Sequence, residues 1–61
     1  MTIYEYARLS TEQKKAVLKN EAILLEHFAA NGNTVYVYFL NNFFIEIVTK
    51  NGKIIDNIPF I

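Results

Sequence analysis

His27 is the only histidine of the chain, and in an antiparallel sheet we expect it to share a row with Tyr36 and, at the far side, Asp56. A histidine, a tyrosine and an aspartate in one row could transfer protons as general acids and bases. Two strands lie between the strand of His27 and that of Asp56, a separation of roughly 10–14 Å, which is too far for direct contact. We therefore interpret these side chains as a partly buried polar edge, and we predict no catalytic residue.

Two glutamates, Glu26 and Glu46, flank Val37 on one face of the same expected sheet. Two carboxylates about 10 Å apart could suggest acid and base catalysis of glycoside hydrolysis. Such pairs act in a deep cleft, and the surface of a small sheet offers none. We interpret the two glutamates as a solvated row whose charge discourages wrong strand pairing.

The aromatic side chains, four tyrosines and five phenylalanines, could stack on the bases of single-stranded nucleic acid. Proteins that do so combine the aromatic residues with a basic groove. Here the lysines form two groups that do not alternate with the aromatic residues: Lys50 with Lys53, and Lys14, Lys15 and Lys19. Six basic and six acidic side chains also leave no positive excess for phosphate contacts. We expect core packing, and a nucleic-acid-associated accessory protein is kept only as the alternative.

The composition also predicts no cofactor and no metal site. The chain has no cysteine, and one histidine cannot build a zinc site by itself. Both glycines, Gly32 and Gly52, follow an asparagine in expected hairpin turns, so there is no glycine-rich phosphate loop. The sequence thus indicates a protein that is not an enzyme.

The elements that position these residues are a helix and a series of strands. Ser10 and Gln13 form a capping-box pattern that begins a helix over residues 11–20. Residues 21–30 fit either an extension of that helix or a strand that turns at Asn31 and Gly32, and we favour the strand. Residues 34–40, 43–49 and 53–58 then read as strands joined by two-residue turns.

The predicted fold is therefore α+β, with a short N-terminal helix packed on a four-stranded antiparallel meander. A longer helix plus three strands is the alternative. Residues 1–61 form a single domain, since a chain this short holds one core at most. The first six residues, MTIYEY, are too apolar for a free tail, and we expect them to pack on the domain.

The period of two in a strand divides the expected sheet into two faces. The helix, through Val17 and Leu18, is expected to cover the first face. That face holds Ile23, Leu25, His27, Tyr36, Tyr38, Leu40, Phe43, Ile45, Ile47, Thr49, Ile54, Asp56, Ile58 and Phe60. The second face holds a candidate interaction face made of Leu24, Phe28, Val35, Val37, Phe39, Phe44, Glu46 and Val48. It also holds Glu26, Ile55 and Asn57.

A single helix cannot cover both faces of this sheet. The apolar patch on the second face would be large for a monomer, whose biggest patches run about 300–600 Å². Either the N-terminal segment folds over it, or another chain does. A one-residue bulge at the last hairpin would move the final strand by one residue and exchange its two sets of side chains.

Several short motifs, TIYEYARL, EQKKAVLKN, ANGN and FFIEI, make the chain similar to a group of short, uncharacterised bacterial proteins. The resemblance covers nearly the whole chain and implies a helix followed by an antiparallel meander. In that group a strand, often preceded by a glycine, follows the first helix, whereas Glu21 stands at this place here. The resemblance implies no activity, ligand or catalytic residue.

Size and composition lead to the predicted function. A core of this size rarely contributes more than roughly 3–5 kcal/mol, and oligomerisation is a common reinforcement. The sequence shows no signal-peptide pattern and no run near the roughly 20 apolar residues that span a bilayer, so we expect no membrane partner and a cytoplasmic location. We predict a small non-enzymatic protein-interaction module, a homo-oligomer or the partner of another protein.

Overall fold

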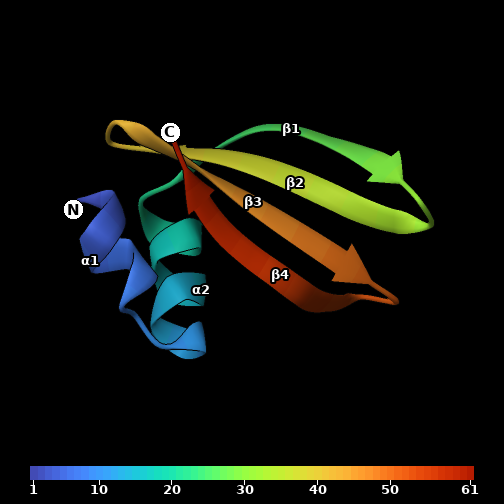
Figure 1. Cartoon of the computed structure of the whole chain (residues 1–61), viewed down its shortest axis with the longest axis horizontal. Coiled ribbons are helices and arrows are strands. Elements are labelled where there is room, and N and C mark those ends of the chain that lie inside the picture. The colour runs from blue at the N-terminus through green and yellow to red at the C-terminus, as the bar shows by residue number, and fades with distance from the viewer.

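The structure, a computed structural model, describes all 61 residues and has two helices followed by four strands (Figure 1). The elements are α1 (Ile3–Ala7), α2 (Thr11–Asn20), β1 (Ile23–Ala30), β2 (Asn33–Leu40), β3 (Phe43–Lys50) and β4 (Lys53–Phe60). The strands form one antiparallel sheet in the order β1-β2-β3-β4. The predicted α+β meander is confirmed. Neither helix is long and apolar enough to cross a membrane.

Both helices begin with a capping box. The Gln13 N–H donates to Ser10 Oγ at 3.2 Å, and the Ser10 N–H donates to Gln13 Oε1 at 2.9 Å, as predicted. Thr2 and Glu5 exchange the same two hydrogen bonds and begin α1, which the sequence analysis did not predict. These bonds occupy main-chain donors that have no partner inside a helix, so they fix where each helix starts.

The segment after α2 is a strand, and the alternative of a longer helix is wrong. The helix ends at Asn20, and the N–H groups of Glu21 and Ala22 both donate to the Val17 carbonyl, at 2.9 and 3.2 Å. From Ile23 onward the chain pairs with β2 along its whole length. Good helix formers therefore adopt a strand because pairing with β2 outweighs their local preference.

The three hairpins have two-residue turns, as predicted. Asn31, Asn41 and Asn51 have φ angles of 53°, 56° and 52°, and Gly32 and Gly52 have 80° and 76°. Asparagine and glycine are the residues that adopt this left-handed region at least cost. The turns thereby fix the register of the residues nearest to them.

Two bulges shift the register farther from the turns. In β1, Leu24 pairs with Tyr38 and Glu26 with Val37, so Leu25 is the extra residue. The prediction that placed Leu24 on the second face is therefore wrong, because one extra residue reverses the alternation beyond it. By the same shift, Ile23 pairs with Phe39 and lies on the second face.

The bulge in β4 falls at Ile55, since Ile54 pairs with Thr49 and Asp56 with Val48. Three side chains predicted on the first face, Asp56, Ile58 and Phe60, lie on the second face instead. Asn57 moves the opposite way and pairs with Ile47. The two sets of side chains on β4 are thus exchanged, as a bulge at the last hairpin would do, but the bulge lies at Ile55, three residues after Gly52.

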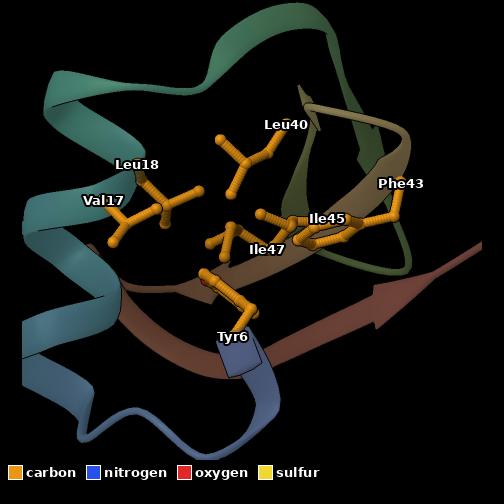
Figure 2. Packing of buried hydrophobic residues seen from close by; sticks show 7 residues of the cluster. All are labelled: Tyr6, Val17, Leu18, Leu40, Phe43, Ile45 and Ile47. Carbon is orange, nitrogen blue, oxygen red and sulfur yellow. The ribbon is translucent and has the colours of Figure 1, made fainter. Parts of the chain in front are cut away.

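The core lies between the helices and the first face. Figure 2 shows its side chains converging from α1, α2, β2 and β3: Tyr6, Val17, Leu18, Leu40, Phe43, Ile45 and Ile47. Tyr6 is fully buried, its ring centroid lies 5.9 Å from that of Phe43, and its hydroxyl donates to Asn57 Oδ1 at 2.7 Å. The N-terminal segment therefore packs on the domain, as predicted, and it does so on the same face as α2.

Candidate interaction face

The second face is the side of the sheet that points away from the helices. Since Phe43, Ile45 and Ile47 point into the core, their neighbours on β3 point to the other side. The pairing register then gives its main members: Ile23, Glu26, Phe28, Val35, Val37, Phe39, Phe44, Glu46, Val48, Asp56, Ile58 and Phe60. No helix packs on this face.

A ladder of three phenylalanines crosses one end of the second face. The ring centroids of Phe39 and Phe44 are 5.3 Å apart, and those of Phe44 and Phe60 are 5.4 Å apart with nearly parallel planes. Ile23 extends the row on β1, opposite Phe39. Such aromatic pairs contribute about 0.5–1.5 kcal/mol beyond their buried area, so the ladder is an ordered apolar surface.

An acidic row lies beside the ladder. Glu26 and Glu46 flank Val37 as predicted, and Ile58 completes the row on β4. Asp56 lies in the next row, opposite Val48. The one ion pair of the chain joins Lys15 Nζ to Glu12 Oε1, at 3.6 Å, so none of these three carboxylates has a cationic partner.

The second face leaves much apolar surface uncovered. Ile23, Phe28, Ile58 and Phe60 are 61%, 45%, 47% and 39% exposed. Val37, Phe39, Phe44 and Val48 are half-buried by their neighbours on the sheet. Val35 alone is buried on this face; it lies outside the core cluster, which indicates that side chains of its own face cover it.

The structure thus brings six of the eight predicted interaction residues together on a surface that a partner could reach. These are Phe28, Val37, Phe39, Phe44, Glu46 and Val48. Leu24 lies on the first face, and Val35 lies beneath its neighbours. Sequence reasoning missed Ile23, Ile58 and Phe60. The adjacent Ile54 and Ile55, which interrupt the alternation of β4, were the signal that a bulge could occur there.

The expected row of His27, Tyr36 and Asp56 does not form. The His27 and Tyr36 rings lie 5.9 Å apart on the first face, whereas Asp56 lies on the second. No three acidic, histidine or cysteine side chains lie close enough together to bind a metal ion. The most prominent feature of the sheet is therefore the second face, where aromatic and acidic side chains lie side by side.

No protein-family model matches the chain, and no curated protein and no solved structure is significantly similar to it. Conclusions about function rest on the geometry of the molecule.

Proposed function

We propose that the protein is a small non-enzymatic interaction module that self-associates or docks a partner protein through the second face. The observation that carries the proposal is the exposure of large apolar side chains there, from 39% at Phe60 to 61% at Ile23. The N-terminal segment was the only part of the chain expected to cover this face, and it packs on the other one. Covering the second face therefore takes a second chain.

The free energy available is of the size that association needs. Complete burial of a large apolar side chain contributes about 1.5–3 kcal/mol, and the four most exposed ones are about half exposed. Burying their exposed halves contributes roughly 3–6 kcal/mol per chain, or roughly 6–12 kcal/mol for a symmetric dimer. The loss of translational and rotational freedom costs about 4–15 kcal/mol. Because these amounts are similar, we expect a reversible dimer whose strength depends on how well the faces fit.

The molar mass in solution tests the proposal. Light scattering over a hundredfold dilution should give a mass above the 7.1 kDa of one chain at the highest concentration. The mass should fall towards that of the monomer as the protein is diluted. A monomeric mass at every concentration would exclude self-association and leave the docking of another protein as the proposed function. If Phe39 and Phe44 were then also well protected from solvent, the whole proposal would be contradicted.

The alternative, a nucleic-acid-associated accessory protein, gains some support from the grouping of Lys14, Lys15 and Lys53 around one cleft. Against it, the phenylalanine ladder lies far from the lysines, since Phe44 and Lys50 are about 20 Å apart along β3 at ordinary strand rise. Binding to single-stranded nucleic acid that weakens steeply with salt would favour the alternative. The proposal includes the cytoplasmic location predicted from the sequence.

A further inference from the structure

A cleft of about 650 Å³ lies between the first half of α2 and the start of β4. One wall is formed by Thr11, Lys14 and Lys15, and the other by Gly52, Lys53, Ile54, Ile55, Asp56 and Asn57. Its volume falls within the range of about 300–1,000 Å³ that is typical of ligand sites. Six consecutive residues form the second wall, so the cleft follows the strand. At about 3.3 Å per residue they span roughly 20 Å.

That wall is the free edge of the sheet. β4 is last in the strand order and pairs only with β3. Beyond that pairing, β4 makes one hydrogen bond, in which the side chain of Asn57 accepts from Tyr6. Lys53 closes a two-residue turn opposite Lys50, so the main-chain N–H and C=O of the next residue, Ile54, face outward. Pro59 has no N–H to offer, which confines strand addition to the part of β4 along the cleft.

The cleft is positively charged although the whole chain is neutral. Three of its lining residues are lysines, and Asp56, whose side chain belongs to the second face, is the only acidic residue among them. Lys14 Nζ lies 5.4 Å from the centroid of the Tyr6 ring, and this cation–π contact restricts the lysine side chain. The pair between Lys15 and Glu12 is well exposed and therefore weak, so Lys15 remains available to an anion.

The side chain of Asn57 adds a neutral donor. Its Oδ1 accepts the hydrogen bond of the buried Tyr6 hydroxyl, which leaves the amide Nδ2 as the donor for a ligand. The lysines line both walls of the cleft and do not converge on one point. This arrangement fits a ligand that extends along the strand and carries several negative charges.

We propose that the cleft binds an extended acidic peptide segment, which adds to the sheet as a fifth strand beside β4. Strand addition supplies main-chain hydrogen bonds, and the lysines on the two walls select for acidic side chains. The other edge strand, β1, has no helix beside it (Figure 1), so β4 alone offers an edge inside a cleft. This site lies at the edge of the sheet and shares only Asp56 with the second face, and the inference does not depend on the proposed function.

The test measures binding of a fluorescein-labelled hexapeptide of alternating glutamate and valine, by fluorescence anisotropy at low salt. Lys14→Glu and Lys53→Glu should each weaken binding roughly fivefold, because each replaces an attraction between surface charges by a repulsion. Lys19→Glu is the matched control: it lies on the same helix but outside the cleft, and it should leave binding unchanged.

A second peptide, methylated on every main-chain nitrogen, has the same charge but has no N–H group on either edge with which to pair as a strand. Its binding should be lost, and the unmethylated peptide should slow hydrogen exchange at the Ile54 amide. No binding at millimolar peptide would overturn the proposal. Equal binding of the methylated peptide, displacement by millimolar inorganic phosphate, or equal weakening by Lys19→Glu would overturn it too, because each indicates attraction by charge alone.

Discussion

The substitution Ile58→Lys places a charge in the middle of the second face. Ile58 is 47% exposed and lies opposite Glu46 on the neighbouring strand. In the monomer the new lysine can keep its aliphatic stem on the sheet and set its ammonium group near Glu46. The folded monomer should therefore lose little stability, about 1 kcal/mol from the half of the side chain that is buried.

Self-association should lose much more. Burying the exposed half of Ile58 contributes about 0.7–1.4 kcal/mol, and a symmetric dimer contains the residue twice. The dimer should therefore weaken by at least roughly 1.5–3 kcal/mol, which raises its dissociation constant roughly 10- to 100-fold. Sedimentation equilibrium over a hundredfold dilution measures this constant directly.

Leu24→Lys is the matched control, because Leu24 is 46% exposed but lies on the first face. It introduces the same charge at a side chain of nearly equal exposure, and it should leave the dissociation constant unchanged within about threefold, or about 0.7 kcal/mol. Denaturant unfolding of both variants checks that each is folded. If the two substitutions weaken association equally, or only Leu24→Lys does, the second face is not the contact surface and the reasoning is refuted.

Three further perturbations test separate parts of the account. Glu46→Gln should tighten self-association by about 1 kcal/mol, measured by the same dilution series, because a buried carboxylate opposes a contact between identical faces; weaker association would mean that the carboxylate has a cationic partner there. Tyr6→Phe removes the hydrogen bond to Asn57 and should cost about 1 kcal/mol in urea unfolding at pH 7. Burial raises the pKa of Tyr6 above 10.0, so the folded state holds this proton more tightly than the unfolded state does. The resulting contribution to stability is lost as the pH rises beyond about 10. Tyr6→Phe should reduce this loss of stability at high pH, and an unchanged pH profile would contradict the role given to Tyr6. Ser10→Ala breaks the capping box of α2 and should lower the free energy of unfolding by about 1 kcal/mol, whereas no change would show that the cap is dispensable.

The elements that local chemistry determines could be predicted from the sequence. Ser10 and Gln13 fixed the start of α2, and the asparagine turns fixed the three hairpins. The capping box of Thr2 and Glu5 is equally visible in the sequence, but the prediction for residues 1–6 rests only on their apolar character and therefore omits α1.

The composition of the second face could be predicted for the two central strands and for the part of β1 nearest its turn. The residues of β2 and β3 alternate without interruption between two tight turns, so Val37, Phe39 and Phe44 lie where expected. In the edge strands the bulges at Leu25 and Ile55 reverse the alternation. A bulge depends on how two paired strands pack against each other and against the rest of the domain, and an edge strand tolerates it because only one of its sides is paired. A short sequence window can show where a bulge is possible, as the adjacent isoleucines of β4 do, but not that it forms.

The central claim is that a second chain covers the second face. Hydroxyl-radical footprinting of Phe39, Phe44 and Phe60 measures this directly when it is done at high and at hundredfold lower protein concentration. We expect protection of the three rings at high concentration and faster oxidation on dilution. Tyr4, which is 75% exposed and lies outside the sheet, should react equally at both concentrations. Equal oxidation of the phenylalanines at both concentrations, with a monomeric mass throughout and no protection by any added protein, would contradict it.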